Sequence, residues 1–277
     1  MASSSGMAVE FPSSSRTAAR LRHIHAHLAA AAQEVEEELY SDPDPDRVEY
    51  TSHDTDEVVA AIKKDGVALL KGVLSRETAA HLGSLLTGYE ALPHEAGMQI
   101  LKDGRINSSQ NAITIMFNRD PAWLACVDPE PVVKAMDAIL CPSHGPESCH
   151  LITMKGWRNF PGYNGAKGAA PGVHGGGFHC DDDPVPLSHV APEDFPFIPP
   201  NICTALHYLA GAPPELCPTR VIPGSHRSGR RPEAHEREFN GRTPLSAVAE
   251  PGDVLIFRCD VWHAVRPSPA CSCCSSA

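Results

Sequence analysis

The side chains best suited to chemistry in this chain are two histidines and one aspartate, which fall in two separate places. His179 and Asp181 form a His-x-Asp pair, and His263 follows Trp262 far downstream. In an extended strand, side chains two residues apart point to the same side, so His179 and Asp181 could reach one ion together. Two imidazoles and one carboxylate are the set that holds Fe(II) on one face and leaves the other positions open for substrate. The spacing therefore predicts a metal site formed by His179, Asp181 and His263.

Helical patterns in the front half of the chain would carry such a site. One helix is expected to begin after Asp54 and to stop at Asp65-Gly66, and a second to begin at Ser75 and to end near Gly88. A third is expected over residues 129–140, where apolar side chains share one face.

Short apolar runs, many of them bounded by Gly and Pro, are expected to form strands. They cover residues 67–70, 150–154, 202–209, 220–222 and 254–257. The Gly252-Asp253 turn before the last run should fix the register that aims His263 inward. This texture predicts a mainly β fold with flanking helices, a sandwich or jelly roll.

Composition narrows the class of protein. The chain has 277 residues, and its 42% hydrophobic and 21% charged residues are typical of a globular protein. A formal charge of −11 argues against nucleic acid as a partner, and no apolar run approaches the ~20 residues that span a bilayer. The ten Cys are scattered, which favours reduced intracellular thiols over a disulfide framework. We expect a small-molecule substrate, a cytoplasmic location, and a monomer or weak homo-oligomer, although residues 1–30 could serve in organellar targeting.

Four stretches of the chain carry a family resemblance. They are 57–75 (EVVAAIKKDGVALLKGVLS), 177–182 (GFHCDD), 219–227 (TRVIPGSHR), and 251–257 (PGDVLIF) with Trp262-His263. In this order they resemble segments of the phytanoyl-CoA dioxygenases, a family of Fe(II)/2-oxoglutarate-dependent oxygenases. The resemblance implies a double-stranded β-helix, cupin-like in form, with His179, Asp181 and His263 as iron ligands. It also implies 2-oxoglutarate and molecular oxygen as cosubstrates, and a hydroxylated small-molecule metabolite as product. Within these stretches, His226 and Arg227 are expected to serve as structural turn residues.

One residue that the resemblance requires is missing. In the family an Arg about eleven residues after the distal His grips the far carboxylate of 2-oxoglutarate, because a guanidinium fork matches a planar carboxylate. In this chain that position is Cys274, so the C-terminal strands are expected to be truncated. Lys155 and Arg158, before the metal motif, are the alternative anchors.

The predicted organisation has three parts. Residues 1–53 form a variable leader, helix and linker, residues 54–267 the jelly-roll domain with its N-terminal helices, and residues 268–277 an atypical Cys/Ser tail. Two other functions stay open at this point. The chain could be an inactive truncated homologue with impaired 2-oxoglutarate binding, or a cupin-like metal-binding module. His174 and His189, which flank the motif, are competing metal ligands.

Overall fold

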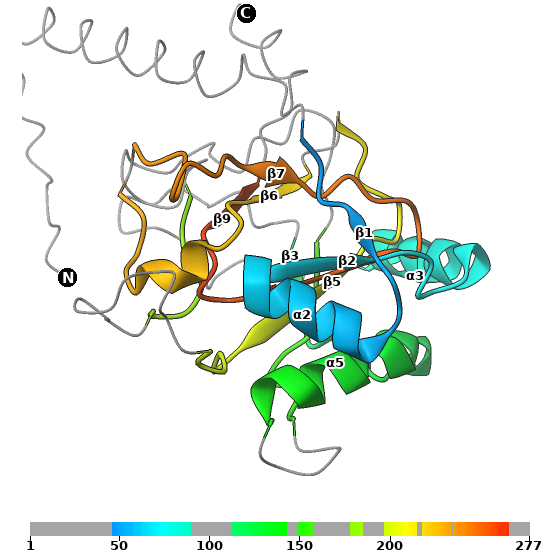
Figure 1. Ribbon diagram of the computed structural model, residues 1–277. Coiled ribbons are helices and arrows are strands. Elements are labelled where there is room, and N and C mark those ends of the chain that lie inside the picture. The colour runs from blue at the N-terminus through cyan, green and yellow to red at the C-terminus, as the bar shows by residue number, and fades with distance from the viewer. Residues whose placement is uncertain are drawn as a thin grey trace, which may run out of the picture. The chain divides into compact units, whose positions relative to one another are not determined.

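A computed structural model of the chain describes residues 46–89, 112–142, 149–157, 178–184, 197–214, 218–233 and 235–265 (Figure 1). The chain divides into two compact units, 1–43 and 44–277, and all of the described residues belong to the second. Among them, no helix combines the length and the apolar character that a membrane crossing needs.

Two sheets of the described residues carry the fold. The larger sheet has four strands in the order β1-β2-β8-β5, and the smaller has three in the order β7-β6-β9. Their bounds are β1 (Tyr50–Thr51), β2 (Val67–Leu70), β5 (Cys203–His207), β6 (Thr219–Val221), β7 (Leu245–Ser246), β8 (Val254–Arg258) and β9 (His263–Val265). A separate hairpin pairs β3 (Ala112–Thr114) with β4 (Lys155–Trp157). Every pairing is antiparallel except that of β1 with β2.

Helices cover one face of the larger sheet. Figure 1 shows α2 (Thr55–Asp65) and α5 (Glu130–Leu140) beside each other there, with α3 (Arg76–Gly88) at one end. The side chain of Asp54 accepts hydrogen bonds from the first backbone N–H groups of α2, and Gly66 ends that helix in the left-handed conformation. Ser75 caps α3 in the same way as Asp54 caps α2. The expected boundaries of these helices follow from such local signals.

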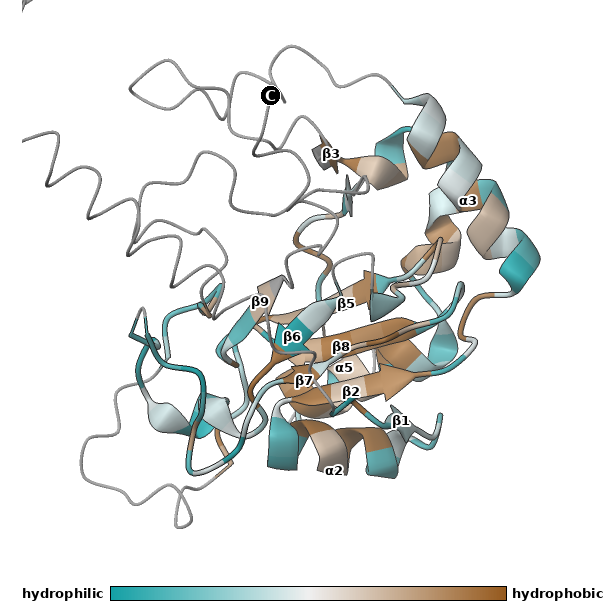
Figure 2. Cartoon of the chain, turned by 90° about the horizontal axis from the view of Figure 1, so that it is seen from above, coloured by the Kyte–Doolittle hydropathy of each residue, from teal (hydrophilic) through white to brown (hydrophobic). Residues whose placement is uncertain are grey.

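The two central strands of the larger sheet, β2 and β8, bury side chains on both faces, and successive side chains point to opposite faces. Along β2, Ala68 and Leu70 pack toward α2 and α5, whereas Val67 and Leu69 join the inner cluster with Leu255 and its neighbours. The hydrophobic colouring of β2 and β8 in Figure 2 reflects this double burial. The inner cluster includes Leu69 and Leu255 of the larger sheet and Val221 of the smaller, so it fills the space between the two sheets. His263 lies beside this cluster, with its ring 4.8 Å from that of Phe257.

Residues 46–51 join the two sheets. Tyr50 pairs with Leu69 in the larger sheet, and Arg47 bridges to Ser246 in the smaller. The backbone N–H of Val48 donates to the carbonyl of Ser246 (3.1 Å). These contacts place residues 47–51 in the folded body.

The predicted strand at 150–154 is wrong. Those residues have no strand pairing, and β4 begins one residue later at Lys155. Leu151 and Ile152 are 56% and 71% exposed, so their apolar character does not mark a buried strand.

The predicted class is confirmed: the fold is mainly β with flanking helices. Within the described ranges the two sheets stay separate and do not close into a barrel.

Candidate metal centre

His263 is the most deeply buried of the three predicted donors. It begins β9, its side chain is 8% exposed, and its ring lies 4.8 Å from that of Phe257. Its Nδ1 lies 3.0 Å from the carbonyl oxygen of Val261. A carbonyl only accepts, so Nδ1 carries a proton, which leaves Nε2 as the nitrogen that can face Asp181 or a metal.

His179 is held beside His263 by the backbone. The two residues form an antiparallel bridge with reciprocal N–H···O hydrogen bonds of 2.9 Å. Their ring centroids are 4.4 Å apart. Phe178 and Cys180, on either side, are buried on the opposite face at 7% and 2% exposure. The alternation expected of an extended segment therefore turns His179 and Asp181 the same way.

Asp181 completes the group. Its backbone N–H donates to the carbonyl of Cys259 (2.8 Å), and its carboxylate lies 3.4 Å from Nε2 of His263 and 3.7 Å from Nε2 of His179. One ligand atom from each of the three residues lies within 4.8 Å of the others. The hydrogen bond with His263 lowers the pKa of Asp181, and the nearby charges of His179 and Lys155 act in the same direction, against partial burial. The carboxylate therefore stays ionised, as a metal ligand must.

The Pro223–Arg227 segment fixes the strand that carries His263. The hydroxyl of Ser225 accepts from the backbone N–H of Trp262 (2.8 Å), and the N–H of Ile222 donates to the carbonyl of Trp262 (2.9 Å). His226 is 5% exposed, and its Nδ1 lies so close to Gly66 that a Cβ there would meet it at 2.8 Å. Burial, aided by the charge of Arg258, lowers the pKa of His226 to about 3. His226 therefore lies in the packed interior as a neutral side chain, away from the three donors.

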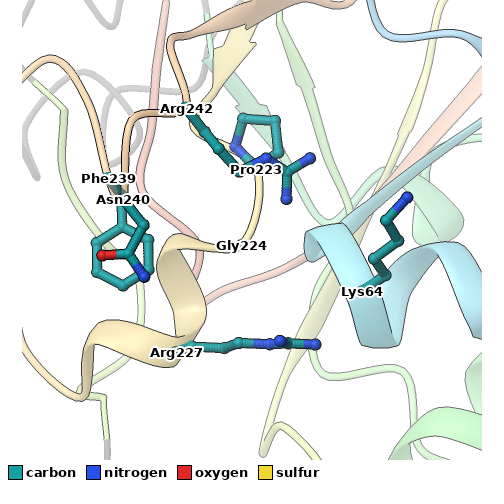
Figure 3. A pocket seen from close by; sticks show the side chains of 7 residues that line it. All are labelled: Lys64, Pro223, Gly224, Arg227, Phe239, Asn240 and Arg242. Carbon is teal, nitrogen blue, oxygen red and sulfur yellow. The ribbon is translucent and has the colours of Figure 1, made fainter. Parts of the chain in front are cut away.

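A hollow open to solvent lies where this segment meets the end of α2 (Figure 3). Its lining residues are Lys64, Pro223, Gly224, Arg227, Phe239, Asn240 and Arg242. Arg227 donates to the carbonyl of Lys63 (3.3 Å), and Arg242 pairs with the carboxylate of Asp65 (2.8 Å). Cations at the C-terminal end of a helix complement its dipole, so these side chains stabilise α2.

Of the two predicted 2-oxoglutarate anchors, the structure describes one. Lys155 begins β4, and its charge contributes to the low pKa of Asp181, so it lies within electrostatic reach of the three donors. Arg158, His174, His189 and Cys274 lie outside the described residues.

Sequence reasoning missed Arg231. Its guanidinium donates to the carbonyl of Cys180 (2.7 Å) and to the carboxylate of Asp183 (2.6 and 3.0 Å). The signal available in the sequence was the basic pair Arg230-Arg231, which follows the PGSH segment and could answer the acidic run at 181–183. The sequence shows that the two segments carry opposite charges, but it does not show that they lie close together in the fold.

Comparison with known proteins agrees with this geometry. The profile of the family described as phytanoyl-CoA dioxygenase (PhyH) matches residues 62–269, which is more than half of the chain. The solved structure of HygX from Streptomyces hygroscopicus with nickel and 2-oxoglutarate bound is similar, with 14% identity and a TM-score of 0.50. The similarity covers 76% of this chain and 80% of that one.

AviO1 from Streptomyces viridochromogenes Tue57 is similar at 17% identity with a TM-score of 0.50, over 78% of this chain and 88% of its own. Both likenesses concern the fold, which is that of the jelly-roll enzymes. The family match concerns more than the fold, because the matched residues include both the His-x-Asp motif and the distal histidine. The chain therefore belongs to the phytanoyl-CoA dioxygenase (PhyH) family and is an oxygenase-type enzyme.

Proposed function

We propose that the protein is an Fe(II)/2-oxoglutarate-dependent dioxygenase that hydroxylates a small-molecule metabolite, with His179, Asp181 and His263 as the iron ligands. The observation that carries the proposal is the convergence of these three donors, from two separate segments, within 4.8 Å. Family membership and the likeness to HygX, whose structure holds nickel and 2-oxoglutarate, support the same reading.

The residues present fit an iron ion in number, type and protonation. Two imidazoles and one carboxylate form the facial set of non-haem iron oxygenases. The hydrogen bond from Nδ1 of His263 to Val261 leaves Nε2 as the donor, which is the usual arrangement of a ligating histidine and its second partner. Donors about 2.1 Å from one ion at right angles lie ~3 Å apart, so the 3.4 and 3.7 Å separations need only small adjustments.

When bound, iron with 2-oxoglutarate and molecular oxygen supplies the oxidant for C–H hydroxylation, with succinate and carbon dioxide as the other products. The protein contributes position and charge. Asp181 remains an anion because its pKa is lowered, and Phe257 gives His263 an apolar wall. The side chains of His179 and Asp181 are 31% and 51% exposed, so this side of the centre remains open to a substrate.

Lys155 is the described residue best placed to hold the far carboxylate of 2-oxoglutarate. It is a cation on the hairpin strand β4, close enough to Asp181 to affect its pKa. An ammonium group offers a point charge instead of the guanidinium fork, so the predicted contact is weaker and less directional than one with Arg. Arg158, three residues later, is the second proposed anchor.

The proposal is tested by titrating metal-free protein with Fe(II) and then with 2-oxoglutarate under anaerobic conditions, while the visible metal-to-ligand charge-transfer band is recorded. Wild-type protein should develop the band. Asp181→Ala should not, and it should form no succinate with or without substrate, because the ion loses its charged ligand.

His226→Ala is the matched control, because this histidine is buried away from the three donors. It should keep the band and lose only stability. Equal loss of iron in both variants would mean that the ligands have been assigned to the wrong histidines. Iron binding without a band on adding 2-oxoglutarate would favour the cupin-like metal-binding module.

A further inference from the structure

Asp181 is the most exposed of the three donors. Its side chain is 51% exposed, whereas that of His263 is 8% exposed and has its own carbonyl partner. The position of the Asp181 carboxylate therefore depends on the path of its backbone through residues 180–183.

Arg231 donates hydrogen bonds on both sides of Asp181, to a backbone carbonyl before it and to a side-chain carboxylate after it. One nitrogen of the guanidinium, Nη1, donates to the carbonyl of Cys180 (2.7 Å). The other two, Nη2 and Nε, donate to Oδ1 of Asp183 at 2.6 and 3.0 Å. A rigid planar fork with three of its donors engaged fixes the separation of the groups it joins. None of these bonds goes to Asp181 itself, so Arg231 does not compete with a metal for the carboxylate.

The residue before Arg231 is tied to the other arm of the centre. The indole N–H of Trp262 donates to the carbonyl of Arg230 (3.1 Å), and the guanidinium of Arg230 lies 5.0 Å from the centroid of that indole ring. Trp262 directly precedes His263. The Arg230-Arg231 pair thus connects the strand that carries His263 with the segment that carries Asp181.

We infer that Arg231 is a positioning residue that keeps the Asp181 carboxylate in register with His263 for metal binding. The geometry comes from the three hydrogen bonds of Arg231. The expected effect on metal binding rests on the proposed function. The ion pair with Asp183 contributes little to global stability, because the Arg231 and Asp183 side chains are 48% and 87% exposed. Loss of Arg231 should therefore loosen the metal site more than it weakens the fold.

Binding of Co(II) to metal-free protein tests the inference, by calorimetry and by the visible spectrum of the ion. Arg231→Gln should weaken Co(II) binding by about 10-fold, the lower end of the effect of removing a group that bonds a ligand directly, and should alter the spectrum. The Co(II) affinity of Arg231→Lys should lie between those of wild type and Arg231→Gln, because one ammonium cannot reach both Cys180 and Asp183. Asp183→Asn leaves the Cys180 bond in place and should have a smaller effect.

Arg76→Gln is the matched control, since Arg76 also makes an exposed ion pair, with Glu250 at 3.3 Å. It should leave Co(II) binding unchanged and give a melting temperature like that of Arg231→Gln. The inference is overturned if Arg231→Gln binds Co(II) with wild-type affinity, or if Arg76→Gln loses as much affinity.

Hydrogen exchange on metal-free protein separates this inference from the proposed function. The amides of Asp181 and Asp182 both donate to the carbonyl of Cys259, at 2.8 and 3.1 Å. In Arg231→Gln the peptide covering residues 178–184 should exchange at least ~10-fold faster than in wild type or in Arg76→Gln. Unchanged exchange would refute the positioning role even if no metal binds. Equal Co(II) binding by wild type and Asp181→Ala would instead refute the metal site.

Discussion

Two buried histidines near the candidate metal centre are held in different ways. The Nδ1–H of His263 donates to the carbonyl of Val261, which leaves Nε2 facing Asp181. His226, which follows Ser225 in the packed interior, is neutral because burial disfavours its charged form. The first arrangement suits metal binding, and the second suits packing.

His226 should make the stability of the protein depend on pH. Its folded pKa of about 3 lies below the ordinary value near 6.5, so below pH ~6.5 the unfolded chain takes up a proton that the folded chain refuses. Well above pH ~6.5, His226 causes no loss of stability. Below that pH, the free energy of unfolding falls as the pH drops. Between pH 6.5 and 5 this residue should account for a loss of about 2 kcal/mol in the free energy of unfolding.

Denaturant unfolding at several pH values checks this expectation. His226→Asn should be less stable at pH 7 but should show a flatter decline toward pH 5 than wild type. It will keep some decline, because burial also lowers the pKa of His207, to about 4. His53→Asn, at an exposed position, controls for the replacement of any histidine. A parallel decline in wild type and His226→Asn would show that His226 is not the source.

The turn between residues 250 and 253 shows how one element sets the register of the central strand β8. Gly252 has φ +96°, its N–H donates to the carbonyl of Tyr208, and its carbonyl accepts from the N–H of Leu74. The carboxylate of Asp253 accepts from the N–H of Gly72, the N–H of Glu250 and the hydroxyl of Tyr50. These bonds lock the start of β8, in line with the register role that the sequence suggested.

Gly252→Ala should therefore cost at least ~2 kcal/mol in the free energy of unfolding. The left-handed conformation is unfavourable for Ala, and its Cβ would lie 2.3 Å from the carbonyl oxygen of Leu74. Gly72→Ala is the matched control: it also has positive φ, but its Cβ would meet no atom within 4 Å, so only the conformational cost of ~1 kcal/mol applies. Equal losses in thermal or denaturant unfolding would mean that the contact with Leu74 has no effect.

Local and non-local signals explain what the sequence could predict. The bounds of α2 and α3 follow from Asp54, Ser75 and Gly66, whose side chains or conformations act on their own neighbours. The convergence of His179, Asp181 and His263 was partly predictable, because the His-x-Asp spacing already turns the first two the same way. The strand at 150–154 was mispredicted because its apolar residues resemble a strand, yet pairing is decided by distant segments.

Arg231 could not be assigned from the sequence for a related reason. Its partners Cys180 and Asp183 lie about fifty residues earlier, and only the folded chain sets that distance. The approach of Lys155 to Asp181 likewise depends on how the β3-β4 hairpin meets the two sheets. Contacts between segments distant in sequence require the tertiary structure.

For the whole molecule, cosubstrate affinity should depend on which cation holds the far carboxylate of 2-oxoglutarate. Lys155→Gln should weaken 2-oxoglutarate binding to the iron-loaded protein by about 10–100-fold, as expected for losing a charge-assisted contact of ~1.5–3 kcal/mol. Iron binding should stay near wild type, since Lys155 is not among the three donors. Anaerobic titration with Fe(II) and then with 2-oxoglutarate, followed by the charge-transfer band, measures both affinities.

A tail variant gives the complementary test. Because Cys274 stands where the family resemblance expects Arg, Cys274→Arg should tighten 2-oxoglutarate binding and should compensate for Lys155→Gln. Low-micromolar binding by the wild type, with no gain from Cys274→Arg, would argue against a missing anchor. Wild-type affinity in Lys155→Gln would remove Lys155 from the site.

The pairing of segments far apart in sequence also sets the order in which the protein can be built. The central strand β8 lies between β2 and β5, and His179 is bridged to His263, so both the larger sheet and the donor group need residues beyond 250. A chain emerging from the ribosome at about 5–20 residues per second presents His179 and Asp181 well before their third partner. A partly synthesised chain thus holds only two of the three donors. The three side chains can therefore come together only after residue 263 has been synthesised.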